Sequence, residues 1–141
     1  MDTTLNPITI SETLVPDRER FEFLPKMFPG CYLVAESTVN AIFRQLTEST
    51  DPVNWDFYTL SNNGYYMAPS VTHGKFHRFV ARGHSFTNVM SCRAIGVTTS
   101  LFALGAMVTK TDSAQLLDHY FALYDYVPFL EESDLIQATI N

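Results

Sequence analysis

The chain has 141 residues, enough for one compact domain that buries most of the apolar surface of its unfolded form. Hydrophobic residues make up 46% and aromatic residues 13%, which excludes a disordered protein. The formal net charge of −6 opposes the phosphate attraction that drives nonspecific nucleic-acid binding, so we expect no direct DNA binding.

The amino-terminal third predicts a tail followed by two helices. Residues 1–14 are Thr-rich with isolated aliphatic residues, which predicts a loosely held tail or a short edge strand ahead of a single domain over 15–141. Helix-start signals at Pro16 predict a helix that Pro25 interrupts or ends early. A second amphipathic helix is predicted over 36–47, where apolar residues recur at helical spacing: Val39, Ile42, Phe43 and Leu46.

The segment from Phe57 to Pro69 predicts a β-hairpin. Two runs rich in aromatic and β-branched residues flank Asn63-Gly64, the pair best suited to the positive φ angles of a two-residue type I′ turn. With this pair at the centre of the turn, Leu60 faces Met67 and Tyr58 faces Pro69. The predicted core face then carries Tyr58, Leu60, Tyr65 and Met67.

A further strand and a central helix are predicted next. Residues 75–80 have strand composition and are expected to add a third antiparallel strand to the hairpin, with an exit at Arg82-Gly83-His84. Ser91 is predicted to cap a buried helix that runs to about Val108. Its uncharged run is shorter than the roughly 20 apolar residues of a membrane span, so no membrane association is expected. Gly96 and Gly105 within it indicate close packing of a neighbouring element.

The carboxy-terminal third predicts two more helices. Asp112 and Gln115 have the spacing of a capping box, and Asp118 and Asp125 lie on the polar face of the helix that follows. Its apolar stripe is predicted to be Leu116, Leu117, Tyr120, Phe121 and Tyr124. Pro128 ends that helix and residues 133–140 form a final short one. Together these elements predict an α+β fold: a single compact domain with a small antiparallel sheet, about three strands with a central hairpin, packed with four to five helices.

The sequence contains few groups suited to catalysis or metal binding. The four histidines, His73, His77, His84 and His119, belong to no recognisable ligand set, so we expect no metal and no cofactor. A hydrolase could use Ser61 with His77 and Asp56, whereas the alternative is that Ser61 and Asn62 satisfy the backbone of the turn. Cys92, near a helix start, is either an activated thiolate or an inert buried thiol.

Acidic residues are concentrated near the carboxy terminus. From Asp112 onward the chain has six acidic residues and no Lys or Arg. The set includes Asp118, Asp125, Glu131 and Glu132, which suit either a solvated helix surface or a patch for a basic partner. Mimicry of DNA over the whole surface is disfavoured, because a duplex carries about one negative charge per 1.7 Å and the acids here are interspersed with basic residues.

Several motifs resemble those of the ArdB/KlcA antirestriction family. Phe57 to Pro69 resembles its signature Phe-Tyr-Xaa-Leu-Ser-Asn-Gly-Gly-Xaa-Xaa-Met-Ala-Pro, with Asn63 at one glycine position. Three further sets also resemble that family: Val15-Pro16 with Arg20, Phe23, Pro25 and Phe28; Ser91 with Ala94 and Gly96; and His119-Tyr120 with Leu123, Asp125 and Tyr126. Arg93 stands where the family commonly has an acidic residue.

The resemblance implies a small, non-enzymatic protein carried by plasmids, phages or genomic islands that relieves type I restriction of incoming DNA. Its partner would be the type I restriction-modification enzyme, opposed directly or indirectly. The absence of a secretion signal and of metal-like cysteine spacing also predicts a cytoplasmic protein. The candidate interaction surface comprises Ser61, Asn62, Asn63, Gly64, Arg93, Asp118, His119, Asp125, Glu131 and Glu132. Two alternatives stay open: a hydrolase or nucleotide-modifying enzyme, and a partial DNA mimic that uses the acidic carboxy-terminal third.

Overall fold

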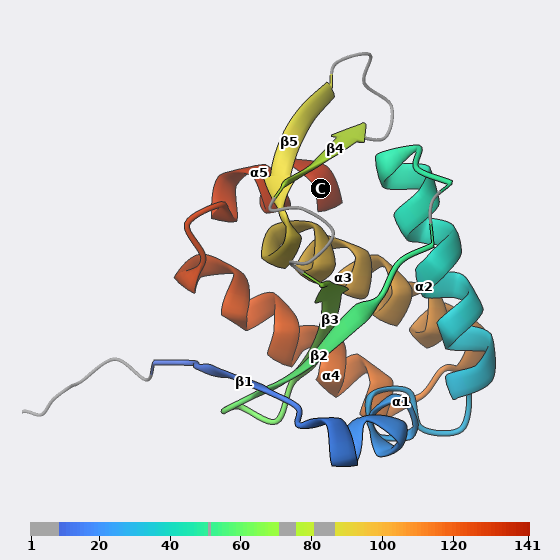
Figure 1. Cartoon of the computed structure of the whole chain (residues 1–141). Helices are drawn as coiled ribbons and strands as arrows, with labels where there is room; N and C mark the ends of the chain where they lie inside the picture. Colours follow the sequence, from blue (N-terminus) through green and yellow to red (C-terminus); the bar gives the residue numbers. More distant parts are fainter. Residues whose placement is uncertain (1–8, 51, 71–75, 81–86) are drawn as a thin grey trace, which may run out of the picture.

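The computed structural model describes residues 9–50, 52–70, 76–80 and 87–141. A three-stranded antiparallel sheet crosses one face of a central helix, α3, which lies between α2 on one side and α4 on the other (Figure 1). The elements in chain order are β1 (Glu12–Leu14), η1 (Asp17–Glu22), α1 (Phe23–Met27), α2 (Tyr32–Thr47), β2 (Trp55–Leu60), β3 (Tyr65–Pro69), β4 (Phe76–Val80), β5 (Thr87–Ser91), α3 (Cys92–Thr111), α4 (Ala114–Tyr126), η3 (Val127–Phe129) and α5 (Ser133–Ile140). The α+β fold class is confirmed.

The composition of the sheet differs from the prediction. Its strand order is β1-β2-β3, so β1 supplies the third strand. The predicted strand at 75–80 is observed as β4, but it pairs with β5 in a separate two-stranded sheet. Neither edge of the hairpin is free, because β1 covers β2 and α3 covers β3. On the α3 side, the Ser100 hydroxyl accepts from the Met67 N–H at 3.1 Å and donates to the Met67 carbonyl at 3.2 Å. The predicted exit at 82–84 lies outside the described residues.

The hairpin is present, but its predicted register is wrong by three residues. Phe57 pairs with Met67 and Tyr58 with Tyr66. The N–H of Leu60 donates to the Gly64 carbonyl at 2.9 Å, which encloses a three-residue loop. Within this loop Asn63 is left-handed, with φ of 69°, whereas Gly64 does not have a positive φ. The predicted core face is therefore also wrong, because residues paired across the strands share a face: Phe57 with Met67, and Tyr58 with Tyr66.

The first two helices are longer than predicted. The segment after Pro16 forms the 3-10 helix η1 and continues into α1, and Pro25 does not end it. Pro25 is the third residue of α1, in the first turn, where its missing N–H has no intrahelical partner to lose. Helix α2 begins at Tyr32, four residues before the predicted start at Glu36. Its buried residues are Ala35, Val39, Phe43 and Leu46.

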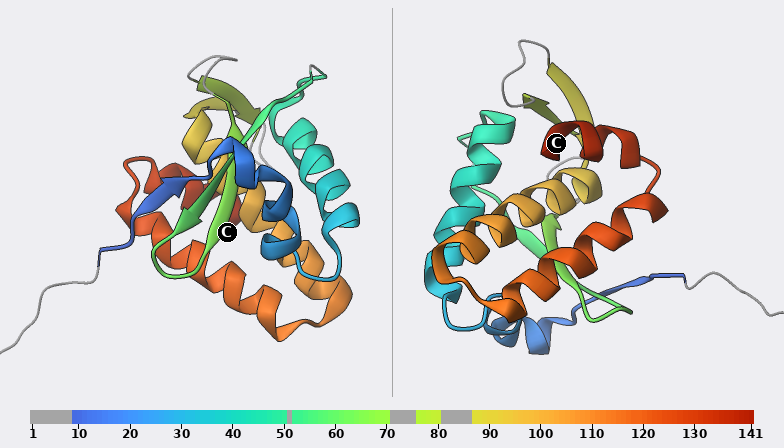
Figure 2. Two further views of the ribbon diagram at one scale, coloured as in Figure 1. Left: turned by 60° about the horizontal axis from the view of Figure 1, so that its bottom comes forward. Right: turned by 180° about the vertical axis from the view of Figure 1, so that it is seen from behind.

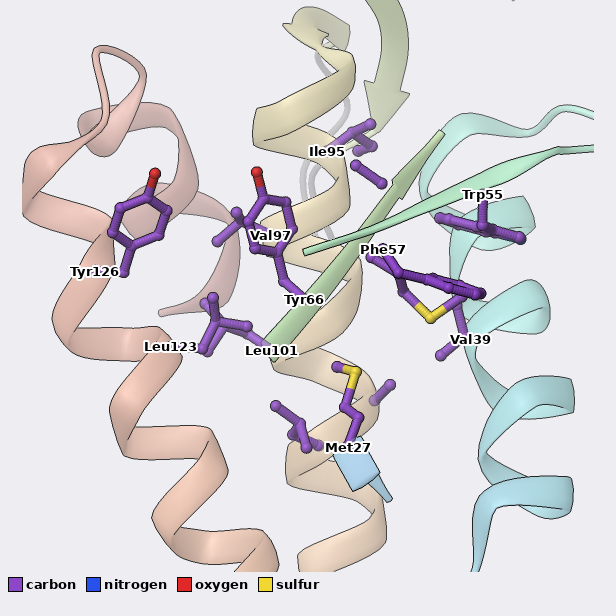
Figure 3. Packing of buried hydrophobic residues seen from close by; sticks show 14 of the residues in the cluster. Met27, Val39, Trp55, Phe57, Tyr66, Ile95, Val97, Leu101, Leu123 and Tyr126 are labelled. Atoms are coloured by element: carbon purple, nitrogen blue, oxygen red, sulfur yellow. The ribbon is translucent and has the colours of Figure 1, made fainter. Parts of the chain in front are cut away.

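Helix α3 is the central helix, as predicted, and it extends to Thr111. Ser91 caps its start, with its hydroxyl accepting from the Ala94 N–H at 3.1 Å. Figure 3 shows Ile95, Val97 and Leu101 from this helix packed among buried side chains of the sheet and of α4. Among the described helices, α3 is the one long and apolar enough to cross a membrane, yet 67% of its most apolar stretch is buried inside the protein. It therefore resembles the core helix of a compact domain.

The two glycines of α3 differ in their surroundings. A Cβ added to Gly96 would lie 2.4 Å from the Cβ of Ala68 and 2.5 Å from its Cα, so β3 approaches the helix as closely as predicted. A Cβ added to Gly105 would have its nearest neighbour, Cε2 of Tyr120, at 3.7 Å. This is an ordinary van der Waals distance, so the prediction of tight packing is wrong for Gly105.

Helix α4 is capped and oriented differently from the prediction. Its cap is Ser113, whose hydroxyl accepts from the Leu116 N–H at 3.3 Å, whereas Asp112 ends α3 with a left-handed φ of 56°. The buried stripe consists of Leu116, His119, Leu123 and Tyr126. Leu117 and Phe121, which were predicted to be in the core, are exposed. Helix α5 spans the predicted residues.

Candidate functional site

Ser61 and Asn62 of the signature turn each have a distinct structural contact. The Ser61 hydroxyl accepts from the N–H of Ser11 at 2.9 Å, and the Ser61 N–H donates to the Ser11 carbonyl at 2.9 Å. Asn62 donates from Nδ2 to the Ala122 carbonyl at 2.8 Å, and its Oδ1 accepts from the Gly64 N–H at 3.2 Å. The turn is therefore held on one side by the segment leading into β1 and on the other by α4.

Gly64 allows the hairpin to approach α4. It is buried, and an added Cβ would lie 2.9 Å from Cδ1 of Leu60 and 3.1 Å from the Cβ of Ala122. Asp118 and Asp125 lie one helical turn before and after Ala122, so both neighbour the turn on the helix surface. Both aspartates are exposed. The structure thus brings the turn and these two predicted residues to one surface.

His119 lies on the buried side of α4 and is 8% exposed. Its Nδ1 is 2.9 Å from the Met27 carbonyl and donates a hydrogen bond to it, because a carbonyl can only accept. Its ring also meets the ring of Tyr65 edge to face, with centroids 5.0 Å apart. His119 therefore joins α1, β3 and α4 and does not reach the surface shared by the turn and the aspartates.

Arg93, Glu131 and Glu132 form a second group around a hollow at the start of α3. The hollow has a volume of about 420 Å³, and Tyr58, Ser91 and Cys92 also line it. Glu132 accepts from the N–H of Ser91 at 2.9 Å, which links the segment before α5 to the cap of α3. Arg93 and Glu131 are exposed, so this hollow presents both charge signs to solvent.

A buried network that the sequence did not indicate lies behind Arg93. One oxygen of Glu12, Oε1, accepts from the hydroxyls of Tyr66 and Tyr126, each at 2.6 Å, and Nε of Arg93 lies 3.4 Å from it. Figure 3 shows the two tyrosine hydroxyls pointing to the same side. Burial, and then the hydrogen bond to Glu12, raise the pKa of both tyrosines well above its usual range. Tyr66 and Tyr126 lie 54 and 114 positions from Glu12 in the sequence, so no local pattern indicates the network.

The network fastens β1 to the core. Glu12 comes from the edge strand, Tyr66 from β3 and Tyr126 from the end of α4. The tyrosine hydroxyls satisfy a carboxylate whose side chain is only 16% exposed, so the burial of that charge is compensated by charge-assisted hydrogen bonds. This arrangement positions Arg93 at the surface beside the hollow.

The arrangement does not favour the alternative of a hydrolase. Asp56 and Ser61 are five residues apart along β2, which separates their backbones by about 17 Å. Asp56 instead lies 4.0 Å from Arg20, and His77 belongs to β4 in the other sheet. Burial, and then the charge of Asp56, raise the pKa of the Cys92 thiol, which makes it a weak nucleophile.

No metal-binding cluster occurs within the described part of the chain, where no three His, Cys, Asp or Glu side chains gather to hold an ion. His73 and His84 lie outside the described residues. The described surface therefore offers charge and shape for binding, and neither an activated nucleophile nor a metal centre was found on it.

Comparisons with known proteins agree on the family of this chain. A sequence profile for the family described as "Antirestriction protein" matches residues 51–141. The chain is 34% identical to an antirestriction protein KlcA of Escherichia coli, with 100% of both chains covered, and 31% identical to another, with 96% of both covered. It is also 29% identical to the uncharacterized protein YafX of Escherichia coli (strain K12), over 94% of this chain and 88% of YafX.

A solved structure also matches the whole chain. It has a TM-score of 0.81 and 30% sequence identity, with 100% of both chains covered. It comes from a study of the KlcA and ArdB proteins, which are described as having a novel fold and antirestriction activity against type I DNA restriction systems in vivo but not in vitro.

Proposed function

Because this chain belongs to the antirestriction protein family, we propose that it relieves cleavage of incoming mobile-element DNA by type I restriction-modification enzymes. The observation that carries the proposal is the full-length match to the KlcA and ArdB structure, at a TM-score of 0.81 and 30% identity. The described activity of those proteins opposes type I systems in vivo. The protein would act in the cytoplasm, where incoming DNA meets the restriction enzyme.

The mode of action in this proposal is binding without catalysis. The separation of Asp56 from Ser61 and the raised pKa of the Cys92 thiol support it. The structural relatives act in vivo but not in vitro, which favours an indirect action that needs a further component of the living cell. Direct inhibition of the purified restriction enzyme is the less favoured mode.

The proposed interaction surface consists of the exposed members of the predicted set. Around the hairpin turn these are Ser61 and Asn63 with Asp118 and Asp125 of α4. Around the hollow they are Arg93 and Glu131, with Glu132 partly exposed. Asn62, Gly64 and His119 are proposed to act indirectly, because they hold the turn and α4 in place.

The test is the plating efficiency of unmodified phage on a host with a type I restriction system, with and without this gene. The expected result is plating close to that of modified phage when the gene is expressed. A host without restriction serves as the control for general effects on phage growth. Unchanged plating against several type I systems would remove the proposal. A second assay adds purified protein to a purified type I enzyme, and undiminished cleavage is expected.

A further inference from the structure

An apolar pair interrupts the acidic surface of α4. Leu117 and Phe121 are 40% and 53% exposed and lie one helical turn apart. Asp118 and Asp125 are exposed on the same side of the helix. We call these four residues the α4 ridge. Single exposed apolar residues are common, but a large aromatic and a leucine in register on one helix face form a contiguous surface.

The aromatic ring at the centre of the α4 ridge is held in place. Phe121 meets Tyr120 edge to face with ring centroids 5.6 Å apart, and Tyr120 packs against Tyr124 at 6.2 Å. The hydroxyl of Tyr124 donates to Oε1 of Gln137 in α5 at 3.4 Å. A side chain already confined by its neighbours loses little rotamer freedom when it binds. Phe121 therefore has the properties of a binding anchor, since rigid aromatic residues commonly dominate interfaces.

A hollow lies next to this aromatic row. Tyr120 lines a hollow of about 290 Å³, together with Phe102 and Gly105 of α3 and Ile140 of α5. Figure 2 shows α3, α4 and α5 side by side on the face turned away from β1 and β2 (right-hand view). The ridge itself is an exposed, convex helix surface. It fits a recess in another protein better than a small molecule, because small-molecule sites are concave.

The charges beside the apolar pair indicate the kind of partner. Among the described residues neither Asp118 nor Asp125 forms an ion pair, and the chain has no Lys or Arg after Lys110. A second copy of this chain is disfavoured, because an isologous contact would bring two acidic ridges together. DNA is disfavoured by the same negative charge.

From these features we propose that the α4 ridge docks into an apolar pocket rimmed by Lys and Arg on another protein of the restricting cell. Phe121 is the anchor, and Asp118 and Asp125 pair with the basic rim. The inference names the class of partner for the proposed antirestriction activity and rests on that proposal. It also agrees with the activity of the relatives in vivo but not in vitro, because a purified restriction reaction would lack this partner.

The test places a photo-crosslinking amino acid at position 121 of the full chain, expressed in restricting cells. The matched control carries the same amino acid at Phe21, an aromatic residue in η1 that is 80% exposed. We expect a specific protein adduct from position 121 and none of the same identity from position 21. Mass spectrometry of the adduct should locate the contact in a segment with apolar residues flanked by Lys or Arg. An adduct with DNA, with a second copy of this chain or with a segment that lacks basic residues would overturn the inference, as would the absence of any adduct.

Substitutions provide a second readout. Phe121→Ser, and separately Asp118→Asn combined with Asp125→Asn, should lower the relief of restriction by about tenfold or more, as expected for an interface anchor. Phe21→Ser should leave relief unchanged. The urea midpoint of each variant shows whether the fold is intact, and the exposed aspartate pair gives a test that does not disturb packing.

The two levels of the proposal fail in different ways. A wild-type chain that gives no relief in the plating assay but still crosslinks a basic partner through position 121 would refute the antirestriction proposal alone. A wild-type chain that gives relief, with undiminished relief in both folded ridge variants, would refute the docking inference alone.

Discussion

The contact between Gly96 of α3 and strand β3 provides a direct test of the packing. In Gly96→Ala the new Cβ would lie 2.4 Å from Cβ of Ala68, 2.5 Å from its Cα and 2.7 Å from the carbonyl oxygen of Met67. Favourable carbon contacts lie at about 3.5–4.0 Å, so the overlap is roughly 1 Å or more. Two of the three atoms belong to the backbone, which cannot rotate away. Strand β3 must therefore move away from α3.

The energetic cost follows from three contributions. Overpacking of this kind costs about 1–3 kcal/mol. Movement of β3 also weakens the two hydrogen bonds between Ser100 and Met67, which are worth about 1 kcal/mol each. Alanine offsets about 1 kcal/mol of this cost, because it is a better helix former than glycine. The net expectation is a loss of about 2–4 kcal/mol in the free energy of unfolding.

Urea denaturation followed by circular dichroism measures this loss. With an m value of about 2 kcal/mol/M, the midpoint should fall by about 1–2 M. Gly105→Ala is the matched control on the same helix, because its Cβ would meet Tyr120 only at 3.7 Å. That variant should gain about 0.5–1 kcal/mol from helix propensity. Equal midpoints for the two variants would refute the packing described for β3 and α3.

Three further predictions concern the turn, the buried histidine and the tyrosine network. Glycine adopts the left-handed φ of 69° without strain, so Asn63→Gly should change the free energy of unfolding by no more than about 0.5 kcal/mol. Asn63→Val should lower it by about 1–2 kcal/mol, because a β-branched residue is strained at this φ. Urea denaturation of the two variants measures both values. His119→Ala leaves the buried Met27 carbonyl without its donor and should lower the free energy of unfolding by about 2–3 kcal/mol. In His119→Asn the amide can donate to the same carbonyl, so the loss in the same measurement should be smaller. An equal loss in the two variants would contradict the assigned hydrogen bond. Burial, and then Glu12, raise the pKa of Tyr66 and Tyr126 above the usual value of about 10, so the folded protein keeps both protons where the unfolded chain releases them. The stabilisation from these tyrosines should therefore be fully present below about pH 10. Above that pH the free energy of unfolding should fall by up to about 1.4 kcal/mol per pH unit for each tyrosine. This fall should be less steep in Tyr126→Phe, and an equally steep fall in the variant and the wild type would contradict the network.

Local patterns predicted the hairpin but not its register. Aromatic and β-branched residues on both sides of Asn63-Gly64 are enough to indicate two strands and a turn. The observed three-residue loop contains Asn62, which donates to the carbonyl of Ala122 sixty positions away, a contact that local sequence does not indicate. The partner of β4 was missed for a similar reason, since composition indicates a strand but not the edge with which it pairs.

The orientation of α4 was also not predictable from local sequence patterns. The helix has more apolar residues than one buried stripe can hold, so the sequence pattern fits two orientations. The structure selects the orientation that buries His119, whose ring donates to Met27 of α1. That contact lies between residues 92 positions apart, and a periodicity argument cannot detect it. Leu117 and Phe121 are left in solvent as a consequence.

The structural contacts of the motif residues change the functional interpretation of the signature motif. Asn62 and Gly64 of the motif, and His119 of the later helix, are occupied by contacts that hold the hairpin, α1 and α4 together. A shared motif of this kind indicates a shared fold, and its substitution would lower activity by destabilising the protein, without any contact to a partner. Exposed residues that break the local pattern without a packing benefit are better candidates for binding, because natural sequences depart from consistent patterning mainly at functional sites. Phe121 meets that description, since it lies on the solvent side of α4 despite its apolar ring. Activity and stability must therefore be measured on the same variants, and only residues that separate the two identify the surface on which this family acts.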